Sequence, residues 1–311
     1  MVKQSVDCKE CSRNLSSLEV FHRHLRTHKI TQAAYYQKHF PRYDKFDGKI
    51  ILFKSREYYF SCDFNSRANL ASWVKKVSRK ECVDYIQQYL LDRKERKGLI
   101  YAPTQVELRT LMVPGQDFIT KLVGDYNEFM TRLGFRVRFD LLKLGEKKKF
   151  HSSHTVLIDT REQMPLTFSL PTRPETLPFG DYRLDDNNFT HKCCIERKAV
   201  GDLYGSVSNG YDRFCRELNR ALDEGFFMVI LVEGSLDAVK IYPSQTGGWV
   251  HLTPEFIYHQ VRRITNSYPN LQFLFVQNRK HASQAIERIF CSDGEYRRTD
   301  LQYAYDTGNL I

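Results

Sequence analysis

Residues 178–202 read PFGDYRLDDNNFTHKCCIERKAVGD, and this stretch decides the fold that we predict. DYRL and FTHKCCIERK are typical of two strands around a DDNN turn, which indicates a hairpin. The two strands carry Asp181 and, after fourteen further residues, Glu196-Arg197-Lys198. Carboxylates on neighbouring strands can hold a hard divalent cation through oxygen ligands. Because such a cation activates water and offsets charge on a phosphoryl group, the pattern predicts a metal-dependent phosphodiesterase.

Strands and helices alternate on both sides of this hairpin. VLIDTREQMPLTF at 156–168 begins with a β-rich run, and FFMVILVEG and LQFLFVQ at 226–234 and 271–277 are continuous apolar runs typical of buried strands. Helical patterns lie at 199–208, 211–225, 253–268 and 281–290. Strands alternating with helices predict the α/β class, with a central mixed sheet flanked by helices.

Three short motifs carry a resemblance to a known family. IDTRE (158–162), FGDYRL (179–184) and IERKAVGDL (195–203) resemble, in order and spacing, the motifs of the XPF-type nucleases, a branch of the restriction-endonuclease-like superfamily. LVEG on the later apolar strand also matches, so the resemblance covers about residues 155–290. It implies a Mg2+- or Mn2+-dependent DNA endonuclease, often selective for branched or flapped DNA. Matched position by position, it implies a site of Asp159, Glu162, Asp181, Glu196, Arg197, Lys198 and Asp202.

The residue types suggest a role for each position. Asp181 and Glu196 are the expected magnesium ligands, with the carbonyl of Ile195 as a candidate third ligand. Lys198 shares a strand face with Glu196 and would orient the attacking water or stabilise the developing charge. Arg197 points to the other face and would brace Asp159 or Glu162. Glu162 and Asp202 are candidates for a second metal, and Arg213 and Arg216 are candidate phosphate contacts one helical turn apart.

Each of these residues also has a structural interpretation. Asp181 follows a glycine and fits an ordinary turn, whereas Glu196 and Lys198 fit an exposed ion pair on a strand. Three ordered motifs with intact charged positions favour the catalytic interpretation. The helix after the last motif departs from the family, because it reads NGYDRF (209–214) where Gly-Arg-(Leu/Phe) is usual.

A second metal site is expected at the N-terminus. Cys8, Cys11, His24 and His28 have the spacing Cys-x2-Cys-x12-His-x3-His, which suits a tetrahedral zinc site. Residues 6–28 resemble the two-Cys/two-His zinc fingers, which have a ββα fold, with Leu15 where an aromatic residue is more usual. The base-reading positions would be Ser17, Val20 and Arg23, of which only Arg23 looks suited to bases. The finger is therefore expected to contact DNA or to serve as a docking or folding module.

Residues 30–144 predict a mainly helical α+β region for DNA binding or targeting. We expect two short strands over 49–64 with a turn at 54–57, and helices over 69–77, 80–98, 104–113 and 115–135. Thr104 and Glu107 suit a capping box. The aromatic residues of AYYQKHFP (34–41) would form either a surface that follows a DNA backbone or a core, and this segment is similar to segments of some phage-encoded endonucleases.

The expected divisions of the chain are a finger (1–29), the middle region (30–144), a linker (145–154), the nuclease domain (155–291) and a C-terminal tail (292–311).

The amino-acid composition indicates which kind of partner the chain binds. Lys and Arg number 47 against 37 Asp and Glu, and the estimated pI is about 9.1. Such an excess of positive charge favours DNA as partner. No apolar run approaches the ~18 residues that a membrane-spanning helix requires. We expect an intracellular location, cytoplasmic for a phage or bacterial protein and nuclear for a eukaryotic one. By family analogy a homodimer or a partner subunit is also expected, with residues 253–268 as a candidate surface. The competing functions are a sequence-specific endonuclease of homing or restriction type and a non-catalytic DNA-binding scaffold.

Overall fold

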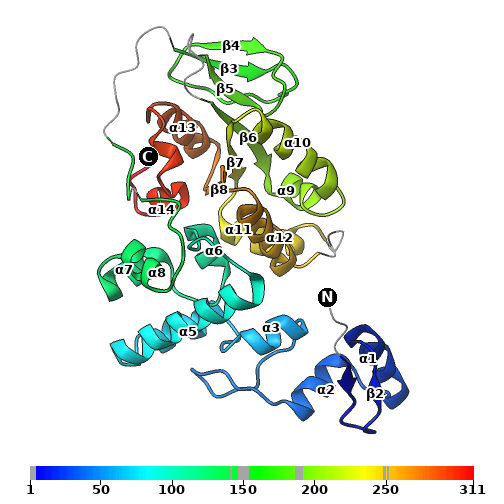
Figure 1. Ribbon diagram of the computed structural model, residues 1–311. Coiled ribbons are helices and arrows are strands. Elements are labelled where there is room, and N and C mark those ends of the chain that lie inside the picture. The colour runs from blue at the N-terminus through cyan, green and yellow to red at the C-terminus, as the bar shows by residue number, and fades with distance from the viewer. Residues whose placement is uncertain (1–4, 141, 146–153, 186–191, 248–249, 251) are drawn as a thin grey trace. The chain divides into compact units, whose positions relative to one another are not determined.

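The computed structural model describes residues 5–140, 142–145, 154–185, 192–247, 250 and 252–311 (Figure 1). Its contacts divide the chain into two compact units. Unit 1 comprises Met1–Asp92 with Met112–Pro114, and unit 2 comprises Arg93–Leu111 with Gly115–Ile311. This division does not fall at 145–154, most of which lies outside the described residues, and the domain limits expected from the sequence stay predictions.

Unit 1 begins with a ββα arrangement. β1 (Val6–Asp7) pairs antiparallel with β2 (Asn14–Leu15), and α1 (Leu18–His24) follows, extended by the 3-10 helix η1 (Leu25–His28). The side chain of Ser17 caps α1 by accepting a hydrogen bond from the amide of Val20. Such a cap satisfies one of the free N–H groups at a helix start.

The next helix packs against this first segment. α2 (Gln32–His39) contributes Tyr35 and Tyr36, which are 1% and 3% exposed in a cluster with Cys8, Phe21 and other apolar residues. The hydroxyl of Tyr35 accepts a hydrogen bond of 2.8 Å from the amide of Lys9, between the two cysteines. Of the two alternatives for these aromatic residues, the structure shows the core.

The two strands expected over residues 49–64 are wrong. The structure has an isolated bridge between Tyr43 and Ile50, and then α3 (Arg56–Ser61). The reason lies in Ser55, whose side chain accepts a hydrogen bond from the amide of Tyr58 and so starts a helix where the sequence suggested a turn. α4 (Arg67–Val74) and α5 (Arg79–Lys97) lie within two or three residues of their expected limits, and α5 runs from unit 1 into unit 2.

Unit 2 is built on a mixed six-stranded sheet. Its order is β4 (Thr172–Glu175), β3 (Thr155–Asp159), β5 (Tyr182–Asp185), β6 (Cys193–Ala199), β7 (Phe227–Glu233) and β8 (Leu271–Val276). β5 is antiparallel to both β3 and β6, and the other neighbours are parallel. This confirms the expected mixed sheet with an antiparallel β5–β6 pair. The DDNN turn expected at 185–188 lies, apart from Asp185, outside the described residues. β4 was not expected.

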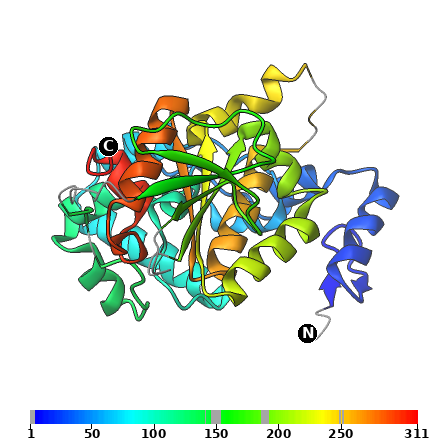
Figure 2. The same cartoon turned by 90° about the horizontal axis from the view of Figure 1, so that it is seen from above.

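Helices cover both faces of the sheet (Figures 1 and 2). Residues of β7 alternate between two cores, with Ile230 and Val232 in one and Val229 and Leu231 in the other. The first core includes residues of α9 (Val200–Ser206), α10 (Tyr211–Asp223), α11 (Leu236–Gln245) and α12 (Pro254–Ser267). The second includes residues of α13 (Arg279–Phe290) and α14 (Leu301–Asp306).

Three helices of the middle region belong to unit 2. These are α6 (Gln105–Thr110), α7 (Gln116–Val123) and α8 (Tyr126–Arg132), and α6 begins with both hydrogen bonds of the Thr104–Glu107 capping box. The buried carboxylate of Glu107 also accepts a 2.7 Å hydrogen bond from Asn266 of α12 and lies 3.4 Å and 3.7 Å from the guanidinium nitrogens of Arg93 and Arg138. α12, the candidate surface for a second subunit, therefore contacts α6 of its own chain.

The segment expected to be a C-terminal tail is part of the fold. Residues 292–311 contain the 3-10 helix η2 (Glu295–Arg297) and α14, whose Leu301 and Ala304 are buried in the second core. Asp300 caps α14 by accepting from the amide of Tyr303. The helix has only six residues, which is too short for a periodic pattern to be recognised in the sequence. Across the described residues, no helix has both the length and the apolar content to span a bilayer.

Candidate active site and metal centres

Asp181 and Glu196 lie next to each other on one face of the sheet. The antiparallel register pairs Tyr182 with Ile195, so one step further Asp181 stands opposite Glu196. The amide of Asp181 donates to the carbonyl of Ile195 at 2.8 Å, and its carboxylate accepts from the amide of Arg197 at 2.7 Å. The backbone therefore holds the Asp181 side chain over the end of β6.

A glycine makes this placement possible. Gly180 has a φ of +71°, in the left-handed region, and an added Cβ would lie 3.1 Å from the carbonyl oxygen of Ile195 and 3.2 Å from the Cβ of Cys194. A side chain at this position would push the turn away from β6. The Ile195 carbonyl, expected as a third ligand, accepts the Asp181 amide with one of its two lone pairs, and its role as a metal ligand stays a prediction.

The electrostatics of Asp181 fit a cation site. Burial, and after it the negative charge of Glu196, raise the pKa of its carboxyl group to about 7. Two carboxylates held this close repel each other unless a proton or a cation lies between them. The pair is thus suited to hold a hard divalent cation, as expected from the sequence.

Lys198 shares the face of Glu196, as its position two residues along the strand predicts. Its ammonium group lies 2.8 Å from Glu196 Oε1 and 4.8 Å from the ring centre of Phe214 on α10. The lysine is 8% exposed. A carboxylate and an aromatic face therefore hold the ammonium group beside the acidic pair.

The opposite face of β6 carries an ionic cluster around Arg197, and the charge of its Glu162 adds to burial and to Glu196 in raising the pKa of Asp181. Arg197 Nε lies 3.8 Å from Glu162 Oε2, and its Nη1 lies 3.8 Å from Glu233 Oε1, which is also 3.8 Å from Arg279. Arg197 braces Glu162, which is one of the two expected options. Glu233 and Arg279 were missed, although LVEG places a carboxylate at the end of a buried strand, where it is unusual enough to be noticed.

Asp159 is held by a residue that the sequence-based site omitted. Arg161 donates to both of its carboxylate oxygens at 2.7 and 2.9 Å, and Leu177 donates its amide at 2.8 Å. The hydrogen bond from Arg161 is the main cause of the lowered pKa of Asp159. Both oxygens are therefore occupied, and Asp159 positions the loop after β3 rather than facing Asp181 as an open ligand. The spacing Asp-x-Arg in IDTRE was the available signal.

The remaining predicted site residues lie apart from this centre or at its edge. Asp202 is exposed in the first turn of α9, and Arg213 and Arg216 are exposed on α10. The carboxylate of Glu162 accepts the amide of Met164 at 2.9 Å. In the described parts of the chain the acidic residues do not form a set of three converging ligands, and the roles of Glu162 and Asp202 at a second cation stay predictions.

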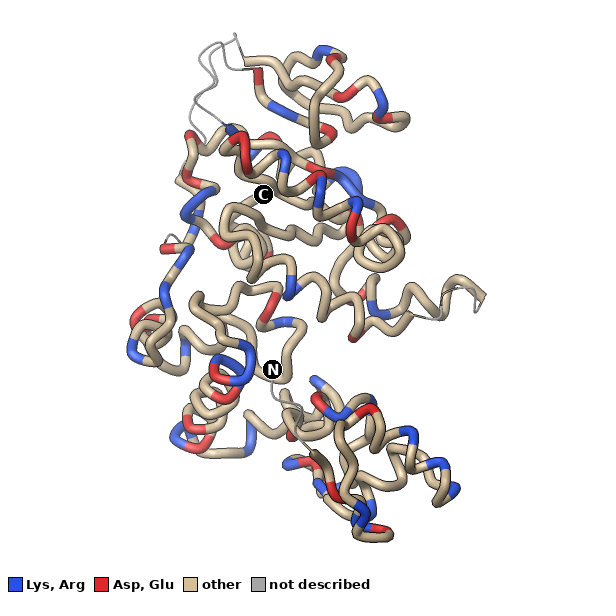
Figure 3. Tube along the Cα trace, turned by 45° about the vertical axis from the view of Figure 1, so that its right-hand side comes forward, with Lys and Arg blue, Asp and Glu red and all other residues tan. Residues whose placement is uncertain are grey.

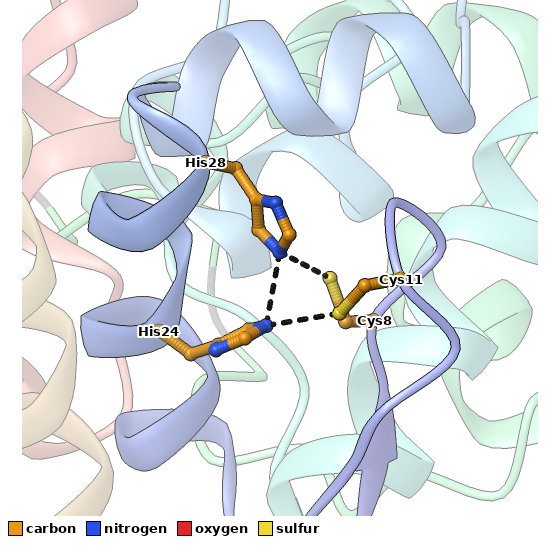
Figure 4. Close-up of side chains that lie close together, drawn as sticks. All are labelled: Cys8, Cys11, His24 and His28. Carbon is orange, nitrogen blue, oxygen red and sulfur yellow. Dashed lines mark hydrogen bonds between the residues drawn. The ribbon is translucent and has the colours of Figure 1, made fainter.

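The four N-terminal Cys and His residues do converge (Figure 4). Their ligand atoms all lie within 4.8 Å of one another, with 3.5 Å between Cys8 Sγ and His28 Nε2 and 3.3 Å between Cys11 Sγ and His24 Nε2. A tetrahedral zinc site with usual bond lengths has S–N edges of about 3.5 Å. Desolvation, followed by the neighbouring His28, lowers the pKa of His24, which favours the neutral imidazole that a metal ligand requires.

Comparisons with known proteins agree on one segment of the chain. Residues 158–289 match the family model of the ERCC4 domain, which confirms the expected XPF-type nuclease domain over this segment. The DNA repair endonuclease UVH1 of Arabidopsis thaliana is 28% identical over 153 residues, covering 46% of this chain and 15% of that protein. The chain therefore spans about a seventh of the length of this curated relative.

Two solved structures are also similar to part of the chain. XPF from Aeropyrum pernix in complex with DNA has a TM-score of 0.33 at 21% identity, covering 44% of this chain and 62% of that one. XPF from Aeropyrum pernix alone has the same TM-score at 22% identity, covering 42% and 62%.

Proposed function

We propose that this chain is a Mg2+- or Mn2+-dependent DNA endonuclease that hydrolyses phosphodiester bonds, with a preference for branched or flapped DNA in repair or recombination. One observation carries the proposal: Asp181, directly before β5, stands opposite Glu196 of β6, with Lys198 beside Glu196, inside the segment that matches the ERCC4 domain. The name of the curated relative, a DNA repair endonuclease, supports the same reaction class.

Each residue of this centre has a part in the proposed reaction. Asp181 and Glu196 would hold the divalent cation, which supplies Lewis-acid charge and a nucleophilic water when bound. Lys198 lies at the same face and would donate a hydrogen bond to the attacking water or to a phosphate oxygen. Arg197 holds Glu162 and Glu233 on the other face and so keeps the end of β6 rigid. Arg213 and Arg216 would contact phosphates outside the reacting centre.

We further propose that Cys8, Cys11, His24 and His28 bind zinc. The convergence of the four ligand atoms supports this, since thiolate and imidazole ligands at these separations suit Zn2+. The zinc would stabilise the part of unit 1 that packs around it, including α2. A homodimer or a partner subunit stays a proposal by family analogy.

The proposal is tested by cleavage of DNA by the full chain with Mg2+. Asp181→Ala and Glu196→Ala should lower cleavage by at least about a thousandfold, because several kcal/mol of transition-state stabilisation by the cation are lost. Asp185→Asn is the matched control, since Asp185 lies at the other end of β5 and pairs with Arg173. Cleavage that persists in both alanine variants would show that the activity, if any, comes from elsewhere.

The same assay separates the competing functions. Rates on a flap, a fork, a four-way junction and a plain duplex should favour a branched substrate. A rate that depends on the base sequence of the duplex would favour an endonuclease of homing or restriction type. DNA binding without cleavage, in the presence of Mg2+ or Mn2+, would favour a scaffold.

A further inference from the structure

In α1, the helix of the N-terminal ββα segment, few of the expected base-reading side chains are available to contact DNA bases. The hydroxyl of Ser17 is used as the cap of α1. Val20 is partly buried against the core around Cys8 and Phe21. Arg23 is the remaining reading position, and it is exposed. One arginine does not specify a site, because a single finger reads about three base pairs through three or more positions.

Arg23 instead borders a hollow of about 480 Å³ between α1 and the start of α2. Arg23 and Arg26 both line it. Ile30 provides apolar surface, whereas Leu25 is only 1% exposed and belongs to the core, and Thr31 with Gln32 lines the side where α2 begins. The N–H groups in the first turn of a helix carry partial positive charge, which adds to that of the two arginines.

The charges of the chain favour an anion at this place. Residues 1–92 contain 17 Lys and Arg against 10 Asp and Glu, whereas the other 219 residues contain 30 against 27. Most of the excess positive charge is thus carried by residues 1–92. Figure 3 marks Lys and Arg in blue and Asp and Glu in red along the chain. Glu19 also lines the hollow, but it lies 3.9 Å from Arg23 and both side chains are more than half exposed, so this pair is weak.

We propose that the sugar–phosphate backbone of DNA lies in this hollow, with a phosphate between Arg23 and Arg26 and a deoxyribose against Ile30. The N-terminal segment then holds DNA without regard to base sequence, because phosphate contacts position a protein but carry no sequence information. This inference rests on the proposed function for its partner, and it adds which surface of unit 1 meets the DNA.

The test is the salt dependence of DNA binding by the full chain. Binding is measured in a Glu196→Gln background without added Mg2+, so that no cleavage occurs. Arg23→Ala with Arg26→Ala should weaken binding about 10-fold to 100-fold at low salt. The slope of log K against log salt should fall by about 1.8 on duplex DNA and by about 1.4 on single strands. These values follow because each lost phosphate contact contributes about 0.9 to the slope on duplex DNA and about 0.7 on single strands. The loss should be equal on duplexes of unrelated sequence.

The matched control is Arg79→Ala with Lys80→Ala, which removes the same charge from exposed positions at the start of α5 in the same unit. It should change binding less than threefold, and Arg23→Lys with Arg26→Lys should keep most of the affinity. Zinc content, measured on every variant, checks that the ββα segment remains folded. Equal losses in the alanine pair and the control would overturn the inference, as would a loss that depends on sequence. If the unaltered chain binds no DNA, the proposed function itself fails.

Discussion

The two candidate metal centres of this chain are assembled in different ways. The four Cys and His ligands lie within 21 residues, in the turn between β1 and β2, in α1 and in η1, and their atoms already converge. The carboxylates of the candidate active site, Asp181 and Glu196, lie directly before β5 and on β6, and Lys198 pairs with Glu196 while Arg161 pairs with the nearby Asp159. The first arrangement suits a permanent structural ion, and the second suits an ion that arrives with substrate and exchanges.

The two centres differ in how much of the surrounding structure depends on the bound metal. Without zinc, the N-terminal centre would hold two thiols and two imidazoles with little else to keep them together, because β1 and β2 have two residues each. The acidic centre is held by the sheet itself, through backbone hydrogen bonds between β3, β5 and β6. Loss of metal should therefore unfold one region and only inactivate the other.

The largest expected effect is the response of unit 1 to zinc removal. Cys8→Ser, or chelation of zinc, should unfold the ββα segment together with α2, since structural zinc contributes about 10–16 kcal/mol of binding free energy that is coupled to folding. Limited proteolysis should then cut residues 5–40 while unit 2 stays intact. Cys62→Ala is the control, because Cys62 is a buried thiol of unit 1 outside the ligand set. An intact N-terminal segment after zinc loss would contradict the proposed structural role.

The acidic centre should lose affinity for Mg2+ as the pH falls through neutrality. The pKa of Asp181 is raised to about 7 in the metal-free protein, so its carboxyl group is largely protonated below pH 7 and a cation must displace the proton. Mg2+ affinity should fall about tenfold for each pH unit below 7 and be constant above it. Calorimetric titration with Mg2+ from pH 5.5 to 8.5 measures this.

The turn before β5 gives a third test of how firmly the sheet holds the acidic pair. Gly180→Ala should lower the free energy of unfolding by about 1–2 kcal/mol, because a side chain at a positive φ is strained and its Cβ would press on Ile195 and Cys194. Cleavage should fall as well, since Asp181 follows directly. Gly205→Ala in α9 is the control, with no atom within 4 Å of its added Cβ, and it should be neutral or stabilising. Urea denaturation measures the free energy of unfolding of both variants. Equal losses in Gly180→Ala and Gly205→Ala would contradict the proposed role of the turn before β5.

The smallest expected effect concerns the ring beneath Lys198. Phe214→Leu keeps an apolar side chain but removes the aromatic face, and it should lower kcat about fivefold with little change in KM, as expected for about 1 kcal/mol of cation–π interaction. Phe214→Tyr should restore the rate. Phe226→Leu is the control, because Phe226 is a buried ring of the same core that lies under Arg183 and Lys192 instead. A similar loss in both leucine variants would indicate a general packing effect.

Local patterns predicted much of the fold and half of the site. Apolar runs predicted β7 and β8, and strand alternation placed Asp181, Glu196 and Lys198 on one face of the β5–β6 pair. The capping box predicted the start of α6. What sequence could not show were contacts between distant segments. The partner of Asp159, the Glu233–Arg279 pair and the burial of α14 all depend on tertiary packing that no short window contains.

The buried carboxylate of Glu107 has a consequence for how unit 2 opens. Glu107 joins α6 to Asn266 of α12 and lies near Arg93 and Arg138, which belong to the segments before and after α6. If any of these partners moves away, a buried charge or amide loses its hydrogen bond. Amide protons of α6 and of the C-terminal half of α12 should therefore exchange with solvent water in a single concerted opening, although they lie some 150 residues apart in the chain. A fragment that starts at the family match would lack α6, and its α12 amides would exchange early.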